Sequence, residues 1–487
     1  MKKESNVIAG NVVSQIIGRV IVLALSLISI KIVTNYLGPT GTGYYNTVVT
    51  YLSFFITIAD FGLFSVGVRE IAKDPTKTNK ILNNIFTIRL ISAIVVTGIA
   101  TTIAFATNYP PEIKYGVALV SLFPILNLLA SVYDIFLQGR LEMQKSALAD
   151  VLSRALAVAV IFLSSVFNLG YYFVLSSVAV TSILNFFLKY LFTAGKIKIG
   201  LSWDRKIIDW IIKLSLPLGI VFIVNNFYFK VDTLILFYFK GAAEVGIYSV
   251  AYKVLETTIF AAAFLAYSLK PLLSVSIENN KNRASKAVST GLVFLLFMSL
   301  AVPIASVPFS KEIIVFLSSS DFLGGAPVLI ILSLAGIFIY LNILLGEIMI
   351  AKDMRKYLIF VSIFVLLFNI IGNIIFIPKY SFLAAAYMTL ASEILLLILG
   401  FLISKKVVTI SIDFFRSLKL LFCASLSIVL AIIFKIFGLN FILAIFCSIA
   451  FYLFSAYSID AMPKLMVDDY ISSLKPKRGQ KRILSFQ

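Results

Sequence analysis

The chain has 487 residues, of which 60% are hydrophobic and only 13% are charged, and its mean hydropathy is +1.01. This composition excludes an assembly of soluble domains. One helix needs ~20 apolar residues to cross a bilayer, so the apolar residues suffice for about fourteen spans and leave no room for a large soluble domain. The sequence has no histidine, and both cysteines lie in apolar stretches, so we expect no imidazole catalysis, no disulfide framework, no metal site and no cofactor.

Long apolar runs, separated by turn residues and charges, predict the elements in chain order. The first run follows Met1-Lys2-Lys3, is longer than a signal peptide and has no small-residue cleavage site, so we interpret it as an uncleaved helix. Together the runs predict fourteen helical spans, near 7–36, 44–68, 81–107, 115–137, 147–168, 171–192, 208–238, 245–269, 287–309, 326–350, 357–378, 382–403, 414–436 and 440–461. A membrane barrel would show alternating strands of ~10 residues instead. The predicted fold class is therefore an all-α polytopic membrane protein.

The distribution of lysine and arginine over alternate loops predicts the orientation. If the N-terminus is cytoplasmic, the inner segments carry 31 of the 42 basic residues, the outer loops carry 5, and six lie inside spans. The positive-inside rule then places both termini in the cytoplasm and the chain in the cell membrane. Because anionic lipid at the inner leaflet attracts the excess charge, the net charge of +19 requires no nucleic-acid partner.

The sequence repeats itself after 203 residues. Gly38-Pro-Thr-Gly-Thr-Gly43-Tyr-Tyr45 aligns without a gap with Gly241-Ala-Ala-Glu-Val-Gly246-Ile-Tyr248. Both copies lie at the outer end of the first hairpin of a six-span block. Because six is an even number, the repeat is parallel, with a pseudo-two-fold axis along the membrane normal.

The repeat predicts two pseudo-symmetric six-helix lobes. The predicted parts are an N-terminal lobe at 1–200, a C-terminal lobe at 201–405, a helix pair at 406–462 and a basic cytoplasmic tail at 463–487. Transporters place their substrate path between such lobes.

Polar residues recur at helical spacing inside the second predicted span. Steps of 4, 3, 4 and 3 residues place on one helical face Asn46, Thr50, Ser53, Thr57 and Asp60. The equivalent polar positions of the eighth span are Ser249, Lys253 and Glu256. The first and seventh spans add Arg19, Asn226 and Lys230. These faces predict one wetted cavity, although serine and threonine often only join neighbouring helices, and for those residues we favour that interpretation.

Charges deep in a span usually face a cavity or a pathway. At ~1.5 Å per residue, Lys230 and Lys253 lie at similar depth on neighbouring antiparallel helices, each about 12 Å from the outer end of its span. Their ammonium groups repel each other unless an anion joins them, and Glu256 neutralises only one. We therefore expect an anion site here. For Arg19 and Asp60, a cavity role and a simple ion pair with each other are equally good explanations.

The remaining charges inside spans have plainer explanations. Snorkelling to the membrane surface explains those within about two turns of a span end, which are Lys31, Arg89, Arg154, Asp134 and Asp150. The isolated carboxylates Glu347 and Glu393 either carry a coupled proton or pair locally, and we favour local pairing.

Four stretches then carry a family resemblance. The first, from Arg19 to Glu70, contains Tyr36-Leu-Gly-Pro, Ala59-Asp60-Phe-Gly-Leu and Val68-Arg69-Glu70-Ile-Ala. The others are Asp232-Thr-Leu-Ile-Leu, Val245-Gly-Ile-Tyr-Ser-Val-Ala-Tyr-Lys253-Val-Leu-Glu256, and Asn369-Ile-Ile-Gly-Asn373-Ile-Ile-Phe-Ile-Pro378-Lys-Tyr380 with Ala384-Ala-Ala. In this order they resemble the polysaccharide-biosynthesis flippases of the O-antigen translocase type, although Ser381 stands where that family usually has glycine.

The resemblance implies membership of the MOP superfamily, together with MATE multidrug exporters and lipid II flippases. It implies a V-shaped, two-lobed bundle that alternates between inward-open and outward-open states and moves a polyprenyl-diphosphate-linked oligosaccharide across the membrane. The cationic cavity residues that would hold the diphosphate are Arg19, Lys230 and Lys253. The tail would either dock a glycan-assembly enzyme or only fix topology and contact anionic lipid, and we favour the second interpretation.

Two other functions remain as alternatives. A MATE-like cation-coupled drug exporter would be expected to have an acidic cavity, so the deep basic residues argue against it. A glycan polymerase or glycosyltransferase would need a large outer loop or an acidic motif at the outer face, and the longest outer loop is only about 310–325. We therefore expect a transporter and no enzyme.

Overall fold

The computed structural model describes residues 2–279, 281–352, 354–406, 410 and 413–462, and these residues form helices and no strands. The all-α fold class is thereby confirmed. Two short 3-10 helices lie at Pro75–Lys77 and Ser320–Phe322. The α-helices are α1 (Lys2–Asp60), α2 (Leu63–Lys73), α3 (Thr78–Ala106), α4 (Pro111–Leu119), α5 (Leu122–Gly139), α6 (Met143–Val166), α7 (Tyr171–Thr193), α8 (Arg205–Lys240), α9 (Ala242–Asn279), α10 (Lys281–Ser299), α11 (Ala301–Leu317), α12 (Gly325–Ala351), α13 (Arg355–Ser404), α14 (Phe414–Ile436) and α15 (Phe441–Ser458).

Eleven helical segments within the described part of the chain are long and apolar enough to cross a membrane. They run from Ser14–Asp60 to Phe441–Ser458. Such a series of apolar helices is typical of a multi-pass membrane protein.

Two helices are interrupted by a residue with a positive φ. The break in α1 is at Gly38, with φ 64°, and the break in α13 is at Ser381, with φ 53°. Glycine adopts this conformation without steric cost, whereas a residue with a Cβ atom pays about 1–2 kcal/mol. Ser381 is thus a serine at a position that favours glycine, which is the departure from the family pattern seen in the sequence.

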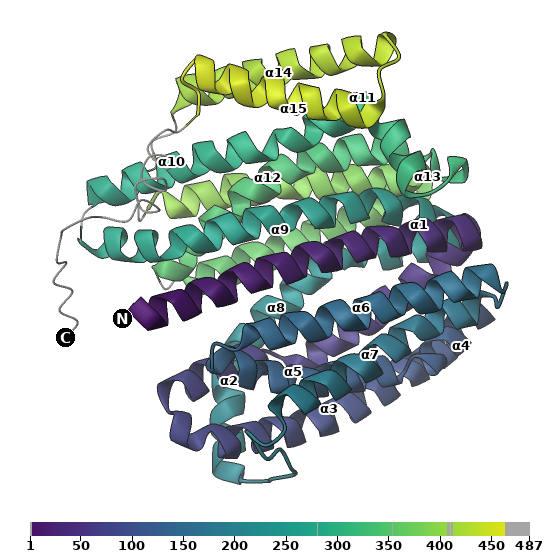
Figure 1. The fold of residues 1–487 in the computed structure, drawn as a ribbon, viewed down its shortest axis with the longest axis vertical. Coiled ribbons are helices and arrows are strands. Elements are labelled where there is room, and N and C mark those ends of the chain that lie inside the picture. Colours follow the sequence, from purple (N-terminus) through teal and green to yellow (C-terminus); the bar gives the residue numbers. More distant parts are fainter. Residues whose placement is uncertain (1, 280, 353, 407–409, 411–412, 463–487) are drawn as a thin grey trace. The chain divides into compact units, whose positions relative to one another are not determined.

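The chain folds into two compact units. The first comprises residues up to Val254, Lys311–Leu329 and Ile359–Ser392, and the second comprises Leu255–Ser310, Ile330–Leu358 and the chain from Glu393 onward. In the first unit, α1 packs along α6, α6 along α7, α7 along α5 and α5 along α3 (Figure 1). Completely buried side chains join α2, α3, α5 and α8, among them Leu63, Leu82, Ile85, Ile135 and Ile211.

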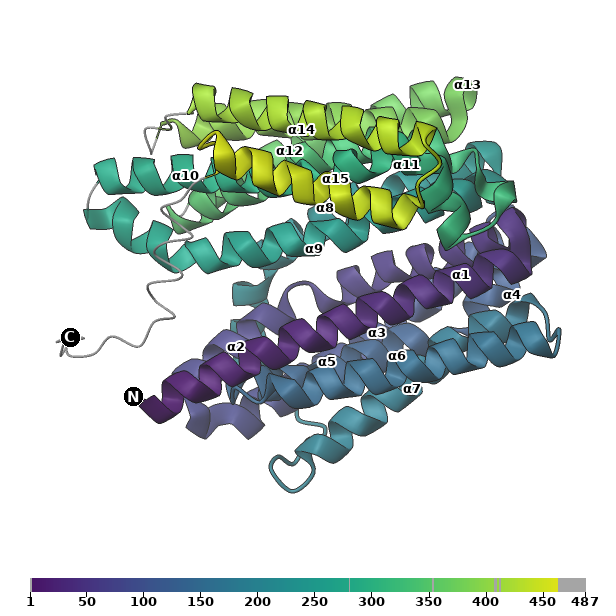
Figure 2. The ribbon, with the colours of Figure 1, turned by 45° about the horizontal axis from the view of Figure 1, so that its top comes forward.

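The second unit has its own core. The helices α14 and α15 form an antiparallel pair (Figure 2), and α14 also packs against α10. Tyr452 of α15 stacks on Phe297 of α10 with ring centroids 5.3 Å apart, and its hydroxyl donates to the Phe297 carbonyl at 3.0 Å. Lipid is as apolar as these side chains, so close packing and such hydrogen bonds hold the helices together.

Candidate functional site

The two copies of the repeat have the same backbone conformation at their first glycine. Gly38 precedes the second half of α1 with φ 64° and ψ −173°. Gly241, 203 residues later, precedes α9 with φ 81° and ψ −173°. Sequence-equivalent glycines thus have the same backbone conformation.

The helices that follow these turns touch at their backbones. A Cβ atom on Gly43 would lie 1.7 Å from the carbonyl oxygen of Ala242. A Cβ atom on Gly246 would lie 2.0 Å from the carbonyl oxygen of Pro39. The two contacts are equivalent, because Ala242 and Gly246 are the residues 203 positions after Pro39 and Gly43. Both contacts require glycine, because any side chain would overlap the facing carbonyl.

One turn further along, a residue bonds to its own repeat equivalent. Asn46 and Ser249 are 203 residues apart, and the Asn46 side-chain amide donates to the Ser249 hydroxyl at 2.9 Å. A contact between equivalent residues arises where a two-fold axis passes between them. The 203-residue repeat is therefore present as a local pseudo-two-fold contact, which we call the repeat crossing: the contact of α1 and α9 at Gly43, Asn46, Gly246 and Ser249.

The predicted polar stripe continues from the repeat crossing along α1. All five of its residues, Asn46 to Asp60, are half-buried. The hydroxyl of Ser53 donates to the Thr50 carbonyl at 2.7 Å, and that of Thr57 donates to the Ser53 carbonyl at 3.0 Å. These hydroxyls are satisfied by their own helix.

Lys230 of α8 joins this stripe. Its ammonium group donates to the Ser53 hydroxyl at 3.5 Å. The same two helices are held together by Phe54 and Phe227, whose ring centroids are 4.4 Å apart. The seventh predicted span thus places a half-buried cation against the polar stripe of the second predicted span, about two turns along α1 from Asn46 of the repeat crossing.

The other predicted site residues lie on the same helices. Lys253 and Glu256 are half-buried on α9, one and two turns beyond Ser249, and Arg19 is exposed on the first half of α1. Asn226 is half-buried on α8, and its side-chain oxygen accepts no hydrogen bond from the described residues. The structure brings together Asn46 with Ser249 and Lys230 with Ser53. Arg19, Asn226 and Lys253 lie elsewhere on α1, α8 and α9, and Glu256 belongs to the second compact unit.

Asp60, at the C-terminal end of the stripe, has a partner that the sequence did not suggest. It forms an ion pair with Arg89 of α3, whose side chain is 0% exposed. Arg89 also donates to the Ser131 hydroxyl at 2.7 Å. Snorkelling of Arg89 was therefore a wrong prediction, because acceptors inside the bundle bind the two terminal nitrogens of its guanidinium in place. The Arg19–Asp60 pair is wrong as well, since Arg89 is the cation bound to Asp60.

Two further charges predicted to snorkel are paired instead. The Lys189 ammonium of α7 lies 2.7 Å from Asp134 of α5 and 3.0 Å from Asp150 of α6. Ser146 donates to Asp134 at 2.6 Å, and Asn185 donates to Asp150 at 2.8 Å. Lys189 is 6% exposed, so this cluster fixes three helices to one another.

Lys31 is also bound by other groups of the protein. Its ammonium donates to the carbonyls of Val315 at 2.9 Å and Ser318 at 2.5 Å. These carbonyls end α11, where the helix dipole favours a cation. The snorkelling prediction for Lys31 is corrected to a helix cap, and that for Arg154 stays a prediction.

Sequence reasoning missed one buried carboxylate, Asp232. It is 3% exposed and accepts hydrogen bonds from the Thr233 amide at 2.7 Å and from the Tyr248 hydroxyl. The available signal in the sequence was an aspartate inside the apolar run 208–238.

For Glu393, the predicted local pairing is confirmed, because the Asn342 amide donates to its carboxylate at 2.7 Å.

A salt-bridged carboxylate, Glu142, lies in the loop after α5. Burial raises the pKa of Glu142, but hydrogen bonds from Lys145 at 2.7 Å and Lys196 at 2.5 Å outweigh burial and hold that pKa below its usual value. Glu142 therefore stays ionised at neutral pH and ties the α5–α6 loop to the end of α7.

Solved transporters share this fold. The structure of the lipid II flippase MurJ in an inward closed conformation matches with a TM-score of 0.75 and 16% identity, over 95% of this chain and 99% of that one. An inward-facing multidrug resistance MATE family transporter of the MOP superfamily matches with a TM-score of 0.67 and 14% identity, over 79% and 94%. A MOP superfamily transporter from Pyrococcus furiosus, described as having a binding pocket of reverse polarity, matches with a TM-score of 0.60 and 15% identity, over 82% and 95%.

The sequence itself matches two family models. The polysaccharide biosynthesis protein model covers residues 8–277, and the MatE model covers 217–375. No curated protein matches the sequence. Because the first model spans more than half of the chain, the protein belongs to the polysaccharide biosynthesis protein family, and it has the membrane fold of the MOP superfamily.

Proposed function

We propose that the protein is a flippase that moves a polyprenyl-diphosphate-linked oligosaccharide across the cytoplasmic membrane by alternating access. The observation that carries the proposal is the half-buried Lys230 bound to Ser53 beside the repeat crossing. A charged headgroup faces a barrier of tens of kcal/mol in hydrocarbon, and cations along its path lower that barrier. Translocation needs no covalent chemistry, so we propose a transporter and not an enzyme.

In this proposal Arg19, Lys230 and Lys253 bind the diphosphate. Glu256 balances the charge of Lys253 when the site is empty, and Asn46 and Asn226 offer amide groups to the sugars. Asp60 acts through Arg89 by keeping the inner end of the stripe in place.

We further propose fourteen spans. At ~1.5 Å per residue, α1 with 59 residues and α13 with 50 residues are more than twice the ~30 Å thickness of the hydrocarbon core. We count each of these two helices as two spans, broken at Gly38 and Ser381, and we add the 38-residue α9 as a further span. The eleven apolar segments then become fourteen spans. The lobes would be residues 1–200 and 201–405, followed by the pair at 406–462, with both termini cytoplasmic.

Alternating access gives the repeat crossing a role. If the lobes separate at the outer side to release the headgroup, the contact of Gly43 with Ala242 and the Asn46–Ser249 hydrogen bond have to open. The substrate and membrane lipids are then the partners. The tail at 463–487, which would contact lipid or a glycan-assembly enzyme, lies outside the described residues.

The test is transport of a fluorescent polyprenyl-diphosphate oligosaccharide in proteoliposomes and export of surface glycan in cells. A charge-assisted hydrogen bond contributes ~1.5–3 kcal/mol, so we expect Lys230→Ala and Lys253→Ala each to slow transport by about 10- to 100-fold. Arginine at either position should preserve most of the rate.

The matched control is Lys240→Ala, because Lys240 is exposed at the end of α8 and should transport normally. Normal transport by the Lys230→Ala, Lys253→Ala double variant would contradict the proposed anion site.

A MATE-like cation-coupled drug exporter remains the second candidate, because the MatE model matches residues 217–375. It predicts that cationic drugs accumulate in cells lacking the protein and that glycan export is unaffected. The half-buried basic residues Lys230 on α8 and Lys253 on α9 favour an anionic substrate instead.

A further inference from the structure

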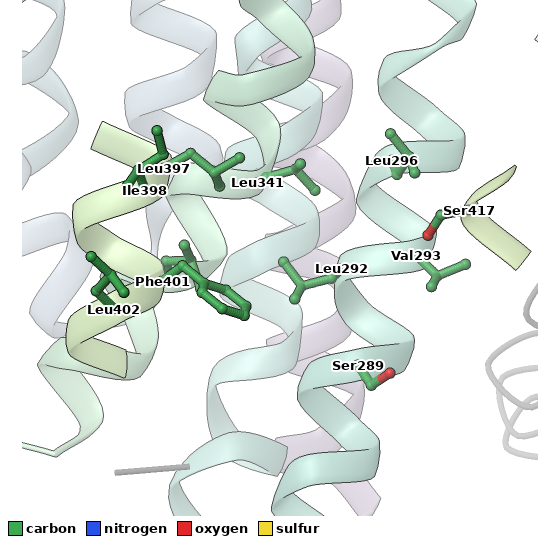
Figure 3. A pocket seen from close by; sticks show the side chains of 11 residues that line it. Ser289, Leu292, Val293, Leu296, Leu341, Leu397, Ile398, Phe401, Leu402 and Ser417 are labelled. Carbon is green, nitrogen blue, oxygen red and sulfur yellow. The ribbon is translucent and has the colours of Figure 1, made fainter. Parts of the chain in front are cut away.

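The second unit contains an apolar pocket of about 330 Å³, separate from the repeat crossing. Figure 3 shows side chains of α10 and α13 facing each other across it, with Leu341 of α12 between them. The lining residues used below are Leu292, Leu345, Ile398, Leu402 and Ser417. All come from helices of one compact unit.

The lining accepts hydrocarbon and offers almost nothing to a polar group. Its two hydroxyls belong to Ser289 and Ser417, and that of Ser417 already donates to the Asp413 carbonyl at 3.0 Å. A cavity of ~150 Å³ takes up one benzene ring, so this pocket takes up on the order of a dozen carbon atoms. That capacity suits part of one acyl chain and excludes a sugar headgroup.

The pocket opens toward lipid. Ile398 and Leu402, which line it, are 52% and 56% exposed on α13. Exposed side chains on a membrane-spanning helix are surrounded by the hydrocarbon chains of the bilayer. A lipid chain therefore reaches the pocket without leaving the membrane.

Basic residues lie at one end of the pocket. α13 ends at Ser404, less than one turn beyond Leu402, and the next residues, Lys405 and Lys406, are exposed. The neighbouring Arg416 is paired with Asp413 at 3.4 Å. Lys405 and Lys406 therefore supply the positive charge for a headgroup at this end.

We propose that the pocket holds one acyl chain of an anionic membrane phospholipid, with its phosphate at Lys405 and Lys406. The apolar lining binds the chain, and the two ammonium groups select lipids with negative charge. A free phosphate would bind more weakly because it makes no contact with the apolar lining. A zwitterionic lipid would bind more weakly because the two lysines do not favour a headgroup without net charge.

The test is native mass spectrometry of the purified full chain with phosphatidylglycerol or phosphatidylcholine added in detergent. We expect one phosphatidylglycerol to be retained more strongly than phosphatidylcholine. Each basic residue at an anionic surface contributes ~1 kcal/mol, so Lys405→Gln combined with Lys406→Gln should weaken phosphatidylglycerol binding by about 30-fold. Lys240→Gln, an exposed lysine at the end of α8, is the matched control and should leave binding unchanged.

A second variant tests the pocket itself. Ile398→Trp fills the open side from a partly exposed position, so it should remove the retained lipid without unfolding the protein. Equal retention of both lipids, or binding unaffected by both variants, would overturn the proposal. Displacement of phosphatidylglycerol by a lower concentration of polyprenyl phosphate would also overturn it, because the pocket would then belong to the substrate's lipid tail.

Discussion

Arg89 is the most deeply buried cation among the described residues of the helix bundle. Its side chain is 0% exposed, and it is bound by the Asp60 carboxylate, the Ser131 hydroxyl and the Leu128 carbonyl. Removing one partner from a buried ion pair leaves a charge that neither water nor protein solvates. The pair therefore fixes the C-terminal end of the polar stripe on α1 against α3 and α5.

We expect Asp60→Ala to lower the free energy of unfolding by about 3–5 kcal/mol, because it leaves the Arg89 guanidinium unpaired. Thermal unfolding in detergent measures this effect. The double variant Asp60→Ala, Arg89→Met should recover much of the lost stability, since neither charge then remains. A double variant that is as unstable as Asp60→Ala would show that the ion pair is not the cause.

The errors at single residues share one physical reason. Position along a helix follows from the sequence, and Lys31 and Asp134 do lie near the break at Gly38 and the end of α5, whereas Arg89 lies near the middle of the segment Pro75–Ala106. The direction in which a side chain points around the bundle depends on how helices pack. Lys189, which binds Asp134, is 55 residues away in the sequence, so no local pattern indicates the pair.

The repeat crossing is the clearest feature at the scale of elements. A small number of identities at a 203-residue offset predicted a parallel repeat, and the backbone contacts of Gly43 and Gly246 bear out its local two-fold character. The prediction succeeded here because glycine at a backbone contact is required by sterics. The polar partner of Asn46 was also predictable, since Ser249 is its equivalent.

Alanine at either glycine of the crossing should separate α1 from α9. We expect Gly43→Ala and Gly246→Ala each to lower the free energy of unfolding by about 1–3 kcal/mol, as overpacking does. Gly98→Ala is the matched control, because nothing lies within 4 Å of its added Cβ atom in α3, and it should stabilise the helix by about 0.5–1 kcal/mol. If all three variants melt alike, the backbones do not touch in the populated state.

At the scale of the whole molecule, composition together with the long continuous apolar runs predicted the all-α membrane fold. Only helices or closed barrels satisfy every backbone group in lipid, and a barrel would need short alternating strands. The number of spans, in contrast, does not follow from the composition. Eleven apolar segments include two that are broken inside, at Gly38 and Ser381. A break changes the span count only if the chain turns back there.

Cysteine labelling of α13 decides between one span and two, in a background where Cys423 and Cys447 are replaced by alanine. Lys356, Lys379 and Lys405 are all exposed and lie near the start, the break and the end of this helix. If the chain turns back at Ser381, cysteines at 356 and 405 react only with reagent added from the cytoplasmic side, and a cysteine at 379 reacts only from outside. A single span would place positions 356 and 405 on opposite sides. Because the positive-inside rule assigns both basic ends of α13 to the cytoplasm, labelling from opposite sides would contradict both the fourteen-span count and the orientation.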